Sequence, residues 1–444
     1  MSDTKIKFRF PGIYWTANTV ELFERAAYYG FFIAVTLYLT NIVGFNDIWA
    51  AWISGVFSAG LYLLPPFTGA FADRIGFRKA IILSFALLST GYFFLGILPY
   101  KAIVIPSLLI IMLGGSMMKP VITGTIAKAT TEESRAKGYS IFYSVVNIGA
   151  FLGKTFAYPL RIQLGLEYIN FFSAIMAFIA LAVVFFMFKK IDESVVKKTF
   201  KEAVQGFIRV FTNLRLLTLI FIVSGFWIIQ GQLYATMPKY VTRTVGITAS
   251  PEWIANVNPF VVMISVVWIT NLTKKMKAIS SMNLGMFIMP LSALLMSLSP
   301  ILQKSAGNEI SILGFFSLHP ITVMLIIGII FQGFAECFIS PRYLEYFSLQ
   351  APKGQEGLYI GFGYLYSFFA NILGFGISGY LLSAYCPDPK TLTPAEMTTA
   401  YNNAHYIWYY FAVIGLTAGI ALMIYRKITD RNKNIKKINE ITTS

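Results

Sequence analysis

Long apolar runs dominate this chain and leave it few ways to fold. Twelve stretches of about 20 mostly apolar residues follow one another, each long enough to cross a bilayer as a helix. They lie near residues 14–39, 48–71, 80–98, 103–127, 139–163, 168–188, 216–238, 252–272, 281–300, 321–345, 357–384 and 405–425. Only 13% of the residues are charged, which is too few to cover the surface of a large soluble protein. The sequence therefore predicts an all-α integral membrane protein and excludes a soluble enzyme or a nucleic-acid-binding protein.

Lys and Arg residues are distributed unevenly between the loops. If both termini lie inside, 27 of the 36 basic residues fall in cytoplasmic segments, six in the opposite loops and three within the spans. Because basic residues are retained on the cytoplasmic side, this bias predicts cytoplasmic N and C termini. It also explains the net charge of +16 without a nucleic-acid partner. We expect a multi-pass protein of the inner or plasma membrane, with the lipid bilayer as its surroundings.

A charged, partly amphipathic segment divides the chain in the middle. We predict an N-terminal six-helix bundle over 1–188, a cytoplasmic basic linker over 189–215 and a C-terminal six-helix bundle over 216–425. The linker is typical of a helix that lies at the membrane surface. Residues 426–444 are expected to form a cytoplasmic tail without regular structure. Six plus six spans around a basic linker resemble the plan of the major facilitator superfamily, whose halves rock around a midplane site.

Six ionisable side chains lie within the predicted spans, three acidic and three basic. They are Glu21, Glu24, Arg25, Lys119, Lys154 and Glu336. Each costs about 2.5–3.5 kcal/mol in the middle of a bilayer. The six must therefore pair with one another or line a hydrated cavity.

Four residues of the first span lie on one helical face. Glu21, Glu24, Arg25 and Tyr28 follow the spacing i, i+3, i+4 and i+7. Counted from the inner ends of their spans, Glu24 and Lys119 lie within one helical turn of each other in depth. We therefore hypothesise a switchable proton-coupling network of Glu21, Glu24, Arg25 and Lys119, in which protonation of a glutamate frees Lys119. The alternative is a static ion-pair clamp between helices.

Several motifs carry a more specific resemblance. The loop GAFADRIGFRK, with Asp73, Arg74 and Arg78, resembles the gating signature loop of the major facilitator superfamily. The segment ELFERAAYYG in the first span resembles the E-x-x-E-R and Y-Y-G motif of the proton-dependent oligopeptide transporter family. KPVITGT, IFYSVVNIGAF and QGFAECFISP resemble further motifs of that family, and they occur in the right order.

This resemblance implies a set of substrate-binding residues. By position in the motifs they are Lys119, Tyr143, Asn147, Trp227, Gln232, Asn258, Glu336 and Ser340. The resemblance further implies that Glu336 receives the amino terminus of a peptide; alternatively, Glu336 is a buried, protonated side chain bonded to a neighbouring helix. Other side chains that combine apolar area with a polar group suit a cavity wall, namely Tyr28, Tyr29, Gln230 and Tyr234.

The chain also departs from the family at three positions. Phe32 replaces an arginine that the family uses toward the carboxylate of the peptide, Gly363 replaces a tryptophan, and Tyr343 replaces a glycine. Lys154 lies on the same face of the fifth span as Asn147. It either holds a substrate carboxylate in place of the missing arginine, or neutralises Glu336, or faces the lipid.

We expect a monomeric symporter of di- and tripeptides or peptide-like zwitterions that is driven by protons. The two histidines, His319 and His405, lie at span ends, which leaves the carboxylates as proton carriers. We expect no cofactor and no metal, since the two histidines and two cysteines are far apart in the sequence, and no phosphate-binding loop for ATP occurs. The alternatives are a family member that carries another organic or inorganic anion, a membrane receptor, or a lipid-modifying enzyme.

Overall fold

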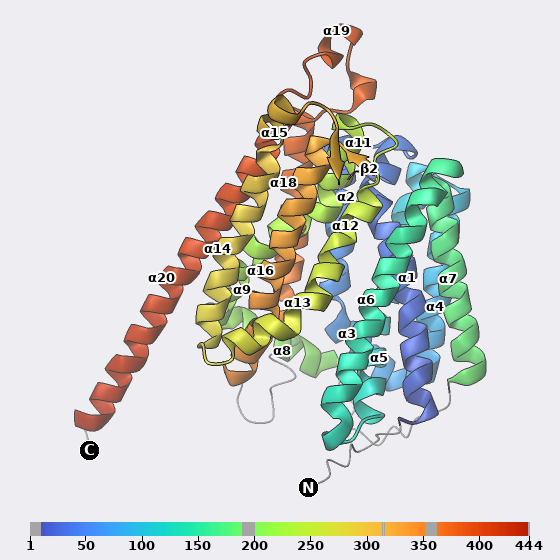
Figure 1. Ribbon diagram of the computed structural model, residues 1–444. Coiled ribbons are helices and arrows are strands. Elements are labelled where there is room, and N and C mark those ends of the chain that lie inside the picture. The colour runs from blue at the N-terminus through green and yellow to red at the C-terminus, as the bar shows by residue number, and fades with distance from the viewer. Residues whose placement is uncertain (1–9, 189–199, 313, 315, 351–361, 443–444) are drawn as a thin grey trace. The chain divides into compact units, whose positions relative to one another are not determined.

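The computed structural model describes residues 10–188, 200–312, 314, 316–350 and 362–442 (Figure 1). Helices cover most of these residues, together with one antiparallel hairpin in which Ser311 pairs with Ser317. The elements in chain order are α1 (Gly12–Asn41), α2 (Asp47–Leu63), α3 (Pro65–Ile75), α4 (Phe77–Ile97), α5 (Lys101–Lys128), α6 (Glu132–Gln163), α7 (Leu166–Met187), α8 (Phe200–Thr212), α9 (Leu214–Gln230), α10 (Gln232–Ala235), α11 (Met237–Thr244), α12 (Pro251–Ala255), α13 (Val257–Thr273), α14 (Ala278–Ser297), α15 (Ser299–Ala306), β1 (Ile310–Ile312), β2 (Phe316–Leu318), α16 (Pro320–Gln350), α18 (Leu365–Tyr385), the 3-10 turn η1 (Pro389–Thr391), α19 (Pro394–Met397) and α20 (Tyr406–Thr442).

The helices are long and apolar enough for a multi-pass membrane protein. Nine helical segments of the described chain pass a test of length and hydropathy for a membrane span, and the bent pair α2 and α3 makes ten. The helices α1 and α6 are 30 and 32 residues long, but their charged and polar residues lower their hydropathy. With these two included, each of the twelve predicted spans has a helical counterpart.

Proline and glycine positions determine where the spans bend. The axes of α2 and α3 differ by 51° at Pro65 and Pro66, because proline lacks the N–H that a continuous helix requires. The seventh predicted span is interrupted at Gly231, between α9 and α10. The eleventh begins at Leu365 rather than at residue 357 in the described chain, and the residues before 362 lie outside the described ranges.

The chain divides into two compact units. One unit consists of Met1–Phe45 and Gly60–Gln205, and the other of Asn46–Ala59 and Gly206–Ser444. Most of α2, residues 47–59, thus groups with the unit that contains the later helices, whereas the sequence predicted α2 as part of the N-terminal bundle.

In the first unit, α1 packs against α6 and α7, and α4 packs against α5 and α7 (Figure 1). Two glycines of α6 allow a very close approach to α1. A Cβ atom on Gly153 would lie 2.3 Å from the backbone oxygen of Ala26, and one on Gly149 would lie 2.7 Å from the Cβ of Arg25. Ser173 of α7 adds a 2.8 Å hydrogen bond to the backbone oxygen of Ala27. This packing encloses the charged face of α1.

In the second unit, α14 packs against α16 and α20, α13 packs against α16, and α9 packs against α18. Gly285 and Gly328 again allow close packing, because Cβ atoms there would come within 2.8 Å of the backbone of α16 and 2.6 Å of Met296. Helix α20 continues to Thr442 and extends past its neighbours in Figure 1. The prediction of a tail without regular structure was therefore wrong. The apolar run ends near Thr429, but charged residues also form helices.

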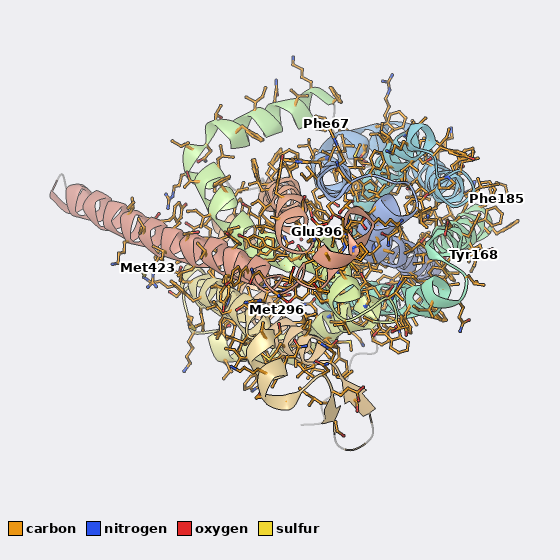
Figure 2. All side chains as sticks on the ribbon, turned by 90° about the horizontal axis from the view of Figure 1, so that it is seen from above. Phe67, Tyr168, Phe185, Met296, Glu396 and Met423 are labelled. Carbon is orange, nitrogen blue, oxygen red and sulfur yellow. The ribbon has the colours of Figure 1, made fainter. Side chains whose placement is uncertain are left out.

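Large apolar side chains cover the outer faces of the helices, as expected for contact with lipid. Tyr168 and Phe185 on α7 and Met423 on α20 lie at the periphery of the side chains in Figure 2, and 46%, 56% and 38% of their surface is exposed. Met296, in contrast, is 2% exposed.

Candidate functional site

The charged residues of α1 form a compact ion-pair cluster within the first unit. Arg25 Nε lies 3.1 Å from Glu21 Oε1, and the same guanidinium pairs with Glu24. All three residues are at most 6% exposed. The two acids and the base that the helical spacing placed on one face are therefore together and buried. Because one guanidinium pairs with both carboxylates within one helix, the pairing lowers the cost of placing these charges in an apolar environment.

A small cavity with room for about one water molecule lies beside this cluster. Helices α1, α2, α4 and α5 provide its walls, which are formed by Glu24, Arg25, Tyr28, Leu61, Leu88, Tyr92, Ile111, Gly115 and Lys119. Glu24 and Lys119, which were predicted to lie at the same depth, therefore line the same cavity. Both residues belong to the same unit.

Lys119 does not pair with a carboxylate among the described residues. Its Nζ lies 4.1 Å from the centre of the Tyr62 ring, where the face of the ring attracts the cation. Arg25 therefore occupies both glutamates, and the ammonium group of Lys119 is available to an anion or to a released carboxylate. Tyr62 was not predicted as a site residue, because a single tyrosine in an apolar span carries no distinguishing pattern.

Aromatic rings extend the site along α1. Tyr28 stacks on Phe32 with ring centres 5.1 Å apart and lies 5.6 Å from the guanidinium of Arg25. Phe32, which occupies the position of the family's arginine, therefore packs against Tyr28 instead of offering a positive charge. Lys154 is 1% exposed, with its Nζ 5.8 Å from the centre of the Tyr29 ring. This burial rules out a lipid-facing Lys154 and leaves the other two interpretations open.

Two predicted residues of α6 lie outside the cavity wall. Asn147 Nδ2 donates a 2.8 Å hydrogen bond to the backbone oxygen of Tyr143, one turn earlier in the same helix, and the side chain of Tyr143 is 49% exposed. This hydrogen bond lies within α6.

The signature loop between α3 and α4 contacts the end of α7. Gly76 adopts a φ of 91° and makes the turn between α3 and α4, for which glycine is suited. Arg78 then donates a 2.9 Å hydrogen bond to the backbone oxygen of Phe185 near the end of α7. Arg74 is exposed and Asp73 is half-buried.

In the second unit, two side-chain amides donate hydrogen bonds to the carboxylate of Glu336. Glu336 of α16 accepts hydrogen bonds from Gln230 Nε2 at 3.2 Å and from Asn258 Nδ2 at 3.4 Å. The three residues come from three helices, α9, α13 and α16. Asn258 and Glu336 were predicted from separate motifs, and Gln230 as a side chain suited to a cavity wall. Ser340, one turn further along α16, is half-buried, and its hydroxyl has no hydrogen-bond partner in the described part of the chain.

Other predicted residues of this unit have packing roles. Gln232 is 1% exposed, donates to the backbone oxygens of Ile228 and Gly374, and accepts a 2.6 Å hydrogen bond from Thr236. Trp227 stacks on Tyr366 with ring centres 5.0 Å apart. Tyr234 is half-buried near the end of α10. Gln232 thus joins α10 to α18 rather than lining a cavity.

The two departures in this unit contact each other. The hydroxyl of Tyr343, on α16, donates a 2.7 Å hydrogen bond to the backbone oxygen of Gly363, and Tyr343 is 2% exposed. The tyrosine that replaces the family's glycine therefore contacts the glycine that replaces the family's tryptophan.

A buried charge cluster in the second unit was missed. Asp47 accepts hydrogen bonds from Lys239 Nζ at 2.7 Å and from Arg243 at 2.8 and 2.9 Å. Arg243 also donates to the backbone oxygen of Cys386 at 2.6 Å and lies 3.9 Å from Asp388. Burial lowers the pKa of Lys239 to about 8, although Asp47 opposes this shift. The sequence analysis counted Lys239 and Arg243 only as loop charges; their i, i+4 spacing was the available signal.

Comparisons with known proteins agree with this architecture. Residues 19–310 and 306–442 match the family described as Major Facilitator Superfamily. Peptide transporter family 1 of Drosophila melanogaster is 30% identical over 153 residues, which cover 32% of this chain and 21% of that protein. The multidrug resistance protein MdtH of Blochmanniella pennsylvanica is 22% identical over 81% of this chain and 83% of its own. The crystal structure of a POT family transporter in complex with 5-aminolevulinic acid matches with a TM-score of 0.74 at 18% identity, over 97% of this chain and 98% of that one.

Proposed function

This chain belongs to the Major Facilitator Superfamily, and on that basis we propose that it is a proton-coupled symporter of di- and tripeptides or peptide-like zwitterions that works by alternating access. The observation that carries the proposal is the cavity in which Glu24 and Arg25 lie beside Lys119. A carboxylate that can take up a proton and a cation that can bind an anion share this one site. Such a pair can link proton uptake to substrate binding.

Charge complementarity supports the peptide class. A peptide zwitterion carries one carboxylate and one ammonium group, and side chains of both signs lie within the predicted spans, Lys119 among the cations and Glu336 among the carboxylates. The amides of Gln230 and Asn258 that bond Glu336 can also bond peptide groups. The relatives named as peptide transporters point to the same class of substrate.

Proton coupling supplies the driving force in this proposal. When Glu24 is ionised, Arg25 holds it; protonation weakens this pair and lets Arg25 or Lys119 engage a substrate carboxylate. One charge moved through ~100 mV yields ~2.3 kcal/mol, which supports accumulation of roughly 50-fold. No cofactor besides the proton takes part.

The proposal includes the setting of the protein. It acts as a monomer in the cell membrane with both termini in the cytoplasm, and it moves a small molecule rather than transforming one. The excess of basic residues in the predicted cytoplasmic segments supports this orientation.

Counterflow of labelled alanyl-alanine in proteoliposomes, with and without a pH gradient, tests the proposed cargo. Exchange of peptide supports the proposal. Inhibition by anions alone, without peptide exchange, would instead identify a carrier of another anion. Absence of flux for any solute would favour a receptor or a lipid-modifying enzyme.

Substitution of Glu24 tests the coupling. Glu24→Gln is expected to abolish uptake driven by a pH gradient while it spares counterflow, because exchange needs no net proton movement. Glu345→Gln is the matched control, since the side chain of Glu345 is 44% exposed and pairs with the nearby Arg342. Concentrative uptake that survives Glu24→Gln would refute the coupling role of Glu24.

A further inference from the structure

Tyr92 is a buried polar residue that the proton network as predicted does not include. It lies on α4 and is 1% exposed, and its ring packs against Phe31 at 5.4 Å between ring centres. Its side chain also forms part of the wall of the cavity that Glu24, Arg25 and Lys119 line. The residue therefore faces the ion-pair cluster from a different helix.

The Tyr92 hydroxyl lies close enough to Glu24 and Arg25 to interact with them electrostatically, and the side chain lines the same cavity. A buried hydroxyl needs a hydrogen-bond partner, because leaving it unsatisfied is costly. Each carboxylate oxygen can accept two hydrogen bonds, so Glu24 retains acceptor capacity after it pairs with Arg25. A water molecule in the cavity would satisfy both groups, because the polar wall offers the two to four partners that a buried water requires.

We propose that Tyr92 is a positioning residue of the proton site, whose hydroxyl holds a cavity water against the Glu24 carboxylate and so sets the pH at which Glu24 takes up its proton. This role rests on the proposed function in so far as Glu24 is the coupling carboxylate. The water and the hydroxyl stabilise the ionised form of Glu24, because hydrogen bonds to a charged group favour its charged state.

The other charged and titratable groups around Glu24 belong to the elements packed around it. Helix α1 contributes Glu21, Arg25, Tyr28 and Tyr29, α2 contributes Tyr62, α5 contributes Lys119, and α6 contributes Lys154. On α7, the titratable residues are Glu167 and Tyr168, at the far end of the helix. Tyr92 is the group of α4 that lines the cavity and bears an ionisable proton.

Tyr92→Phe removes the hydroxyl and keeps the ring against Phe31. Loss of one hydrogen bond to the ionised carboxylate is expected to move the protonation of Glu24 to higher pH by about 0.5–1 pH unit. Gradient-driven uptake should then reach half its maximum at a correspondingly higher pH. Tyr38→Phe is the matched control, because the hydroxyl of Tyr38 bonds the backbone oxygen of Leu95 and Tyr38 does not line the cavity.

Infrared titration of the purified protein provides a readout that needs no substrate. The C=O band of the protonated carboxyl that Glu24→Gln removes should titrate at higher pH in Tyr92→Phe and at the wild-type pH in Tyr38→Phe. An unshifted band in Tyr92→Phe would overturn the inference. A shifted band in a protein that transports no peptide would uphold the role of Tyr92 and refute only the proposed cargo.

A second variant covers the case in which Tyr92→Phe does not fold. Leu88→Phe enlarges a side chain of the cavity wall and is expected to expel the water while it leaves every ionisable group in place. The same upward shift of the band is expected. A band at the wild-type pH in this variant would contradict the bridging water.

Discussion

The buried cluster around Asp47 makes a sharp prediction about stability. Asp47→Asn removes the charge that pairs with both Lys239 and Arg243 and retains the side-chain size. Asp47 and Lys239 are 5% and 1% exposed, so the variant leaves two cations buried. Breaking a buried ion pair in this way costs about 3–5 kcal/mol. Arg243 keeps its bond to the backbone oxygen of Cys386, so the larger part of this cost falls on Lys239.

The cost should depend on pH because Lys239 can lose its proton. Its pKa in the folded protein is about 8, compared with 10.5 ordinarily. Between these values the folded protein has released a proton that the unfolded chain still holds, so the stability of the wild type rises with pH across this window, by roughly 3 kcal/mol from this group. In Asp47→Asn the pKa of Lys239 falls further. The loss of unfolding free energy in Asp47→Asn is therefore largest at pH values below the lowered pKa of Lys239 in the variant. This loss becomes smaller as the pH rises toward 8, where Lys239 of the variant is neutral.

Thermal unfolding in detergent, followed by tryptophan fluorescence at pH 6 and pH 9, measures this effect. Asp388→Asn is the matched control, because Asp388 lies 3.9 Å from Arg243 with 16% of its side chain exposed, and such a contact contributes about 1 kcal/mol or less. If Asp47→Asn unfolds at the wild-type temperature at pH 6, or loses the same stability at both pH values, the cluster does not act as described.

Three further variants test other contacts. Gly153→Ala should cost about 1–3 kcal/mol, because its Cβ would lie 2.3 Å from a backbone oxygen of α1, whereas Gly12→Ala, with open space around it, should leave the unfolding temperature nearly unchanged. Tyr343→Phe should cost about 1–3 kcal/mol because it leaves a buried carbonyl oxygen without its 2.7 Å donor, and equal unfolding temperatures of variant and wild type would contradict this. Glu336→Gln should weaken competition by alanyl-alanine in counterflow about tenfold or more but leave that by an N-acetylated dipeptide unaltered; an equal loss for both ligands would show that Glu336 does not read the ammonium group.

Local patterns predicted the parts of the site that lie within one helix. Glu21 and Arg25 are four residues apart, so helix geometry alone brings them together, and the structure shows the pair. The bend at Pro65 was predictable for the same reason, because proline acts on its own helix.

Contacts between helices were harder to predict. The depth of Lys119 could be counted along its span, but the choice between a carboxylate and the ring of Tyr62 depends on how α2 packs beside α5. The pairing of Asp47 with Lys239 spans 192 positions of the sequence, and a loop charge carries no signal of so distant a partner. Tyr92 was missed likewise, since a tyrosine in an apolar run resembles any other core residue until a cavity is seen beside it.

The contact of Gly149 and Gly153 with α1 has a mechanical consequence. At these points backbone meets backbone, and no intervening side chain can change rotamer to absorb a displacement. In the proposed mechanism, a shift of α1 that re-aims Arg25 after proton uptake would therefore move α6 with it as a rigid body. The motion would reach Tyr143, about two to three turns along α6 from these glycines. Proton uptake at one carboxylate would then be converted into movement of a second helix.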